Sequence, residues 1–184
     1  DEYEGYVQVV DNQSLSVTQR QSVLDALELA KRGLTAAQIK EELERAKFES
    51  SIYIMLDTLK YLKKGGRITP AAAALGSALR LKPVLTIQGE KLDAFAIAKT
   101  KKQGVKKMLS AIEDDINSRF GGVDHMENIH METAHTKNPE AAEELRQQII
   151  EKFGVKQVDL YPLSLSIACH IGPGSLAVAC SKVI

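Results

Sequence analysis

The sequence predicts an α/β fold built on a mixed β-sheet. Short runs rich in β-branched and apolar residues alternate along the chain with amphipathic segments of helical period. Two of these runs, residues 82–88 and 91–98, are separated by only two residues, which is typical of a hairpin. Because a hairpin pairs its strands antiparallel, we expect a mixed sheet and not a purely parallel one.

Capping signals predict the helices of the first half. Ser16 can cap a helix that ends at Gly33, and Thr35 with Gln38 forms a capping-box pattern for a second helix. Thr69-Pro70 is a cap and first-position pair ahead of a helix of small residues. The predicted elements up to this helix are a strand at 6–10, helices at 16–32 and 36–47, a strand at 50–56 and a short helix from 57 to Gly65-Gly66.

The second half continues the alternation after the hairpin. An amphipathic helix is predicted at 101–119, and Asn138-Pro139 begins another helix that Gly154 closes. Residues 125–135 have strand character. The last strand-like runs are QVDLYPLS, LSIACH and SLAVACSKV, from residue 157 to the end.

The composition excludes several classes of protein. The chain has 184 residues, of which 44% are hydrophobic and 26% charged, as expected for a globular domain. Lys and Arg number 24 and so do Asp and Glu, so there is no basic excess of the kind that general nucleic-acid binders carry. No apolar run approaches the ~20 residues of a membrane span, so stable membrane insertion is not expected. Two cysteines make no disulfide framework, and a reducing cytoplasmic setting is expected.

The histidines and cysteines do not form a metal-binding pattern. His125, His130 and His135 recur every five residues, a spacing that alternates faces on a strand, so a solvated strand is the preferred interpretation. Cys169 and Cys180 match no usual ligand spacing and are expected to pack as small buried apolar residues. A nucleophilic Cys169 activated by the adjacent His170 is not expected, because neighbouring residues on a strand point to opposite faces.

The stretch KKGGRIT at residues 63–69 is a candidate corner for an anion. Gly65 and Gly66 allow close approach to the backbone, and the guanidinium of Arg67 can grip a carboxylate or phosphate with two hydrogen bonds. The spacing is not that of a P-loop. From this stretch alone, an ordinary glycine cap with a solvated arginine is the preferred interpretation.

The stretch SIACHIGPGSLAVAC poses a second question. His170 stands directly before Ile171 and the turn Gly172-Pro173-Gly174, and a lone histidine in such a run is usually a core residue. Two features favour a ligand contact instead. Glycines in a turn let a ligand meet the backbone, and the small-residue helix after Pro70 leaves space for a long apolar guest.

Two segments, LDTLKYLKKGGRITPAAAALGSALRLKPVLTIQGEKL (56–92) and ACHIGPGSLAV (168–178), resemble the DegV family of bacterial fatty-acid-binding proteins. The resemblance implies two α/β lobes, with residues 1–48 as the C-terminal part of the first and 49–184 as the second. It also implies a carrier, not an enzyme, that binds a long-chain fatty acid. The carrier would present the carboxylate to a separate ATP-dependent fatty-acid kinase, which makes the acyl phosphate. No cofactor and no metal are implied.

The resemblance assigns roles to individual positions. His170 matches a histidine that helps to hold the carboxylate, and Arg67 matches an arginine near the carboxylate or the transferred phosphate. The backbone corners that admit the head group match Gly65, Gly66, Ile171, Gly172 and Gly174. The family's early hydroxyl-bearing stretches would lie upstream of Asp1, Asn12 replaces a usual serine, and Lys99 stands where arginine is common.

Burial of a C16 acyl chain, at ~0.8 kcal/mol per methylene, contributes about 12 kcal/mol to the free energy of fatty-acid binding before ordering costs.

The main alternative is an enzyme similar to dihydroxyacetone kinase subunits, in which His170 holds a small ketone covalently. A purely structural domain with a core histidine is the third interpretation.

Overall fold

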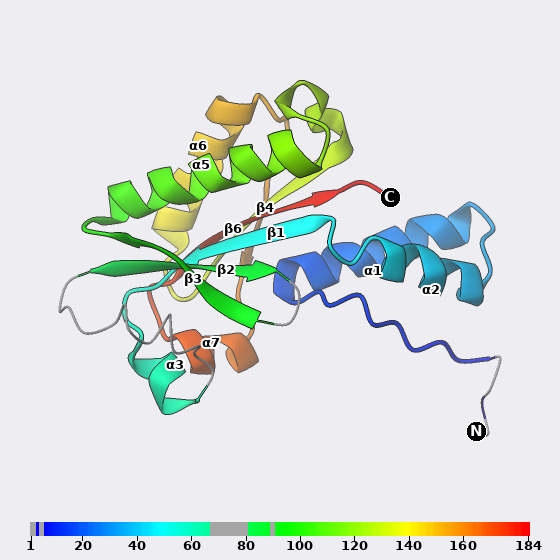
Figure 1. Cartoon of the computed structure of the whole chain (residues 1–184), viewed down its shortest axis with the longest axis horizontal. Coiled ribbons are helices and arrows are strands. Elements are labelled where there is room, and N and C mark those ends of the chain that lie inside the picture. The colour runs from blue at the N-terminus through cyan, green and yellow to red at the C-terminus, as the bar shows by residue number, and fades with distance from the viewer. Residues whose placement is uncertain (1–2, 4–5, 67–80, 89–90) are drawn as a thin grey trace.

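The computed structural model describes residues 3, 6–66, 81–88 and 91–184. In this part of the chain, a six-stranded sheet with the order β3-β2-β1-β6-β4-β5 forms the centre of the molecule (Figure 1). The strands are β1 (Ser50–Met55), β2 (Lys82–Gln88), β3 (Lys91–Ala98), β4 (Ile129–His135), β5 (Asp159–Pro162) and β6 (Leu176–Lys182). The helices are α1 (Ser16–Lys31), α2 (Ala36–Arg45), α3 (Lys60–Lys64), α5 (Lys101–Arg119), η2 (Val123–Asn128, of 3-10 type), α6 (Pro139–Phe153) and α7 (Leu165–Ile171).

The sheet is mixed, which confirms the predicted class. β4 and β5 pair in parallel, and the other neighbouring strands pair antiparallel. The last strand of the chain, β6, lies between β1 and β4, and Ile52 of β1 stands opposite Ala179 of β6. The first and the last strands of the described chain, β1 and β6, are therefore neighbours in the sheet.

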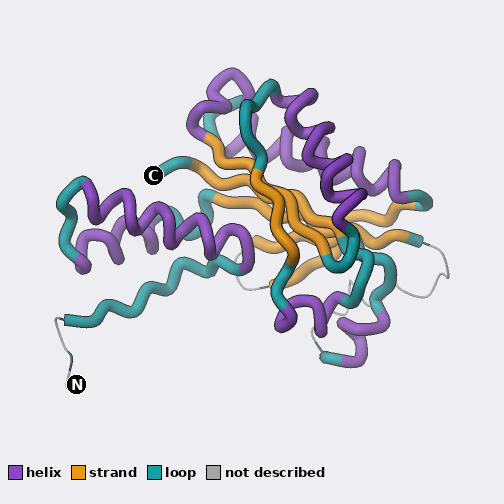
Figure 2. The backbone as a smooth tube through the Cα atoms, turned by 180° about the vertical axis from the view of Figure 1, so that it is seen from behind, coloured by secondary structure: helices purple, strands orange, loops and turns teal. Residues whose placement is uncertain are grey.

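Helices cover both faces of the sheet. α5 and α6 lie on one face, whereas α3 and α7 lie on the other, and Figure 2 shows the two layers from behind. Each layer packs its own apolar core against the sheet. The second core, on the α3 and α7 side, comprises Val17, Ile52, Ile54, Leu56, Leu59, Leu62, Leu85, Ala134, Ile171, Ala177 and Ala179.

α1 and α2 form a helical hairpin that projects from the end of the sheet (Figure 1). Gly33 makes the turn between them with φ of +89°, and the predicted capping box of Thr35 and Gln38 is present at the start of α2. Val17, at the start of α1, packs into the second core. Further along the helix, Val23 and Leu27 stay more than half exposed. Contact with the second core is therefore made at the first turn of α1.

Three strand predictions are wrong in part. Residues 7–10 form no strand, because an extended segment needs a partner strand and none lies beside it among the described residues. Residues 123–128 form η2, so the strand expected at 125–135 begins only at Ile129. Residues 165–171 form α7 and not a strand. Ile167 and Ile171 are four residues apart, so in a helix both side chains lie on the same face. This face packs against the second core.

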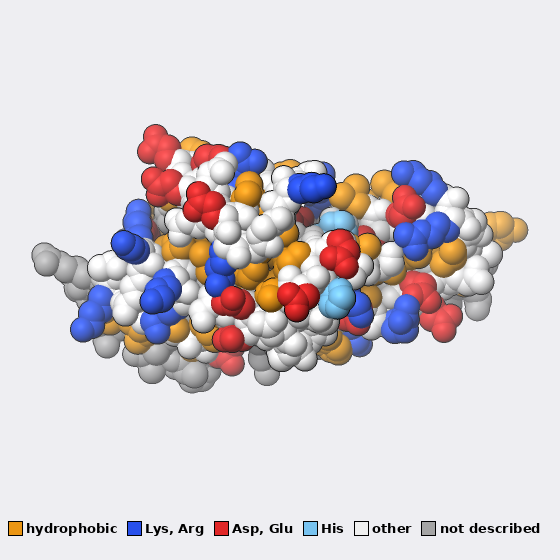
Figure 3. Space-filling view, turned by 90° about the horizontal axis from the view of Figure 1, so that it is seen from above, with side chains coloured by type: hydrophobic (Ala, Val, Ile, Leu, Met, Phe, Trp, Pro, Cys, Tyr) orange, Lys and Arg blue, Asp and Glu red, His pale blue; other side chains and the backbone are white. Residues whose placement is uncertain are grey.

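Charges of both signs are mixed over the face of the molecule that is seen from above. Viewed from above, Lys and Arg side chains alternate with Asp and Glu over the face (Figure 3). Within the described residues, no helix has the length and apolar character needed to cross a membrane.

Candidate functional site

We use the term α3–α7 corner for the region formed by α3, Gly65, Gly66, α7 and the turn Gly172–Gly174. α3 and α7 pack beside each other on one face of the sheet (Figure 1). Gly65 ends α3, as predicted, and Gly66 follows with φ of +63°. Gly172 ends α7, and its N–H donates to the carbonyl of Ala168 at 2.8 Å. The sequence therefore ends both helices with glycine at one place in the fold.

The turn glycines allow protein side chains to approach the backbone closely. A Cβ at Gly172 would lie 3.1 Å from Cγ of Tyr61 and closer still to two other ring atoms. At Gly174 a Cβ would lie 2.9 Å from Cγ of Asp57. Both glycines have φ near +80°, a conformation that other residues rarely adopt. Glycine is therefore required here by both conformation and space.

Hydrogen bonds from the loop after β4 hold the turn in place. The buried hydroxyl of Thr136 donates to the carbonyl of Gly172 at 2.6 Å and accepts the N–H of Ser175 at 2.9 Å. The N–H of Gly174 donates to the Thr136 carbonyl at 2.7 Å, and the Asn138 side chain donates to the Gly174 carbonyl at 3.3 Å. No signal in the sequence indicated these supporting residues, because they are distant in sequence from the turn.

His135 supports the same loop. It is buried, contrary to the expectation of a solvated strand, and its Nδ1 accepts the backbone N–H of Asn138 at 3.1 Å. Burial lowers the pKa of His135. A neutral ring is required for Nδ1 to accept a hydrogen bond. His135 therefore acts as a fixed acceptor beneath the turn.

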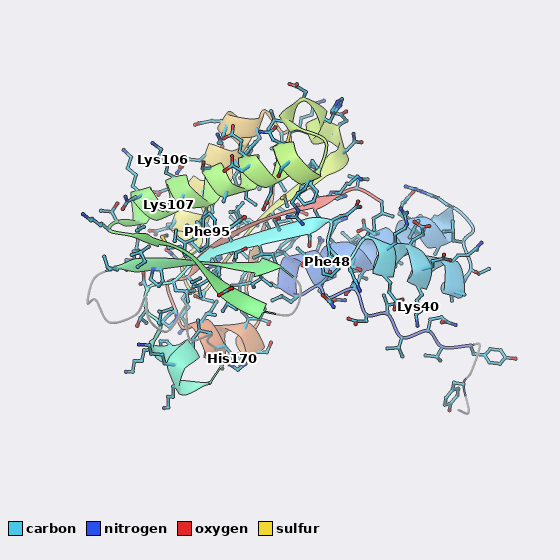
Figure 4. The ribbon with its side chains drawn as sticks, viewed as in Figure 1. Lys40, Phe48, Phe95, Lys106, Lys107 and His170 are labelled. Atoms are coloured by element: carbon cyan, nitrogen blue, oxygen red, sulfur yellow. The ribbon has the colours of Figure 1, made fainter. Side chains whose placement is uncertain are left out.

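His170 lies in the last turn of α7, on the side of the sheet opposite the α5 residues Lys106 and Lys107 (Figure 4). It is exposed, and its ring makes no hydrogen bond to any residue that the structure describes. The neighbouring Cys169 is also exposed, so its predicted burial is wrong. An exposed imidazole that has no partner among the described residues can bind a ligand group.

The corner also carries basic side chains on α3. Lys60, Lys63 and Lys64 are all exposed. The predicted site residue Arg67 and the predicted helix after Pro70 lie outside the described residues. The described part of the corner therefore offers backbone, an imidazole and ammonium groups, which suit a carboxylate or phosphate.

The described residues form no metal-binding group of three or more His, Cys, Asp or Glu side chains. His125 lies in η2 and is exposed, whereas His135 lies buried on β4. Cys180 is buried, as predicted, and burial raises the pKa of its thiol to about 12.

Comparison with known proteins gives consistent results. A family model described as "Uncharacterised protein, DegV family" matches residues 1–183. A DegV domain-containing protein of Clostridium perfringens is 33% identical over 174 residues, which are 94% of this chain and 57% of the relative. A relative from Streptomyces coelicolor is 30% identical over 177 residues, which are 96% of this chain and 60% of the relative.

Solved structures share the fold. A fatty-acid-binding DegV family protein from Thermus thermophilus superposes with a TM-score of 0.85 at 31% identity, covering 98% of this chain and 62% of that one. A stearic-acid-binding protein from Eubacterium ventriosum superposes with a TM-score of 0.86 at 19% identity, covering 98% and 61%, which supports the fold alone. The chain thus spans about three fifths of the length of these proteins.

Proposed function

Because the chain belongs to the DegV family, we propose that it binds a long-chain fatty acid with the carboxylate at the α3–α7 corner. The observation that carries the proposal is the exposed ring of His170 beside the rigid turn Gly172–Gly174. The Thermus thermophilus structure, at 31% identity, is titled as fatty-acid binding and supports the ligand class.

The head group would be held by His170 together with the backbone of Gly65, Gly66, Ile171, Gly172 and Gly174. A neutral imidazole can donate one hydrogen bond to a carboxylate, and an imidazolium can also pair with its charge. The α3 lysines add positive charge at the same place. Arg67 remains part of this proposal.

The acyl chain would lie against the second core. Leu59, which precedes α3, Leu62 of α3 and Ile171 of α7 belong to this core and lie directly behind the corner. An acyl chain entering between these helices and the sheet would exchange water for apolar contact. At ~0.8 kcal/mol per methylene, this contact is the main contribution to affinity.

We further propose that the protein is a carrier that presents the carboxylate to an ATP-dependent fatty-acid kinase. This part of the proposal rests on the family resemblance. Residues 1–48 would belong to the first lobe and 49–184 to the second, and the first lobe would complete the head-group site.

The test compares a fatty acid with its alcohol. Palmitic acid and hexadecanol are titrated by calorimetry against the wild type, His170→Ala and the control His125→Ala, which removes another exposed histidine far from the corner. Loss of the head-group partner should weaken palmitic acid binding in His170→Ala by about ten- to a hundredfold and affect the alcohol much less. Equal losses for acid and alcohol, or for both variants, would contradict a head-group role for His170. Native mass spectrometry of the purified protein would show any lipid it retains.

A further inference from the structure

A cavity lies between α1 and the sheet edge formed by β4 and β5. Its volume is about 820 Å³, which is in the range of small-molecule sites, and none of the described residues predicted for the fatty acid lines it. Part of its wall is apolar, with Leu24, Val123, Met126, Val155, Val183 and Ile184. The cavity is therefore separate from the α3–α7 corner.

Glu132 of β4 lines this cavity and has no partner in the described part of the chain. The residue is 1% exposed, and neither carboxyl oxygen has a hydrogen-bond partner there. Native structures rarely leave a buried polar group unpaired. A donor supplied from outside the chain would satisfy both oxygens.

Among the described residues, no basic side chain forms a hydrogen bond or ion pair with Glu132. Arg20 of α1 stands 3.6 Å from Asp159 of β5 and stacks on the ring of Tyr161 at 4.5 Å, so its guanidinium is already engaged. Asp25 of α1 accepts a hydrogen bond from Gln21 at 2.8 Å, and no basic nitrogen among the described residues lies within 4 Å of its carboxyl. The titratable and charged groups that interact electrostatically with Glu132 are Arg20, Asp25, Asp159 and Tyr161. The other charged or titratable residues that line the cavity are Glu28, Arg32, Asp124, Glu127, His130 and Lys156.

We propose that this cavity binds a primary amine with an apolar body, whose ammonium group donates to Glu132 with Asp25 as a second counter-charge. An ammonium group carries three donors and no acceptor, which matches two unpartnered carboxyl oxygens. The apolar wall takes the carbon body of the ligand. The described residues show no grouping of side chains suited to a metal ion, so N–H donors fit this cavity better.

Protonation of Glu132 gives the proposal a specific signature. Burial, with the nearby charge of Asp159, raises the pKa of Glu132 to about 8. The free carboxyl therefore holds a proton at pH 7, and binding of an ammonium group expels it. Affinity for the amine should rise by about fiftyfold between pH 6 and pH 8 and then level off.

The experiment uses hexylamine as the probe and 1-hexanol as the neutral control, titrated by calorimetry between pH 6 and pH 9. Two buffers of different ionisation heat report the protons released. We expect hexylamine to bind the wild type with the stated pH rise and with close to one proton released at pH 7. Glu132→Gln should bind hexylamine at least tenfold more weakly at pH 8, without the pH rise, and should bind 1-hexanol as the wild type does.

A second variant tests whether the neighbouring histidine of β4 produces the pH rise. His130→Asn should keep the rise, because this variant retains the unpartnered carboxyl of Glu132. Circular dichroism checks that both variants are folded. The proposal is overturned if the wild type does not bind hexylamine at pH 8–9, if Glu132→Gln binds it equally well, or if the pH rise persists in Glu132→Gln.

Discussion

The ring of Tyr61 lies directly against the backbone of Gly172, so that a Cβ at position 172 would overlap the ring. Tyr61 belongs to α3, and Gly172 ends α7. This contact joins the two helices of the α3–α7 corner at Gly172. The carbonyl of the same residue accepts the hydrogen bond from the Thr136 hydroxyl. The position of His170, two residues earlier, therefore depends on a contact between segments that are far apart in the sequence.

Gly172→Ala should destabilise the protein more than a matched glycine substitution. Gly33 has a similar φ of +89° but nothing within 4 Å of a Cβ, so Gly33→Ala carries only the conformational cost of about 1–2 kcal/mol. Gly172→Ala adds the overlap with Tyr61, for a total of about 2–4 kcal/mol. Urea unfolding measures both. The additional loss of stability in Gly172→Ala, relative to Gly33→Ala, should become smaller when Tyr61 is also replaced by alanine. An additional loss that does not change would contradict the contact.

Thr136→Val should loosen the turn. The substitution keeps the shape but leaves the Ser175 N–H and one bond to the Gly172 carbonyl unmade in a buried place. We expect a loss of about 1–3 kcal/mol in the free energy of unfolding. Thr86→Val is the control, because the Thr86 hydroxyl donates a longer hydrogen bond, of 3.2 Å, to the Ile52 carbonyl on a half-buried strand position. Similar losses in the two variants would show that Thr136 does not hold the turn.

Stability should fall as the pH rises, and Glu132 should be the cause. The pKa of Glu132 is about 8 in the folded protein against an ordinary value of 4.5. Between these values the unfolded chain releases a proton that the folded protein keeps, so raising the pH favours unfolding by up to ~1.4 kcal/mol per pH unit. Below 4.5 and above 8 this contribution is constant.

Glu132→Gln should remove this slope, as measured by urea unfolding at several pH values. His135 affects the stability in the opposite direction and over a different pH range. Its pKa is lowered in the folded protein, so it costs stability only as the pH falls below its ordinary value of 6.5. The comparison of wild type with Glu132→Gln at pH 7–8 therefore isolates the carboxyl. A slope that survives the substitution would contradict the assignment.

The two cysteines should differ sharply toward a thiol reagent. Cys169 is exposed on α7, whereas Cys180 is buried on β6 with its pKa raised to about 12. Because the thiolate is the reactive form, one thiol should react readily in the folded protein and the second only on unfolding. Cys169→Ser should remove the fast reaction. Two fast thiols in the native protein would contradict the burial of Cys180.

Local signals in the sequence predicted the helices best. α5 and α6 occupy the predicted ranges 101–119 and 139–153, because caps and apolar spacing act within a few residues of each other. The hairpin of β2 and β3 follows from its short connection in the same way. The resemblance carried by 56–92 and 168–178 named the family correctly.

Burial and strand pairing were decided by the tertiary structure. Residues 7–10 look like a strand but have no partner in the described part of the sheet, and LSIACHI looks like a strand but folds as α7. Glu132 was not predicted as a site residue, because nothing local to β4 shows that α1 and β5 will enclose its carboxyl. The sequence by itself thus determined the class, the longer helices α1, α2, α5 and α6, and the family, since these depend on neighbouring residues. The tertiary structure decided which side chains are buried or free, since burial depends on which distant segments cover each face.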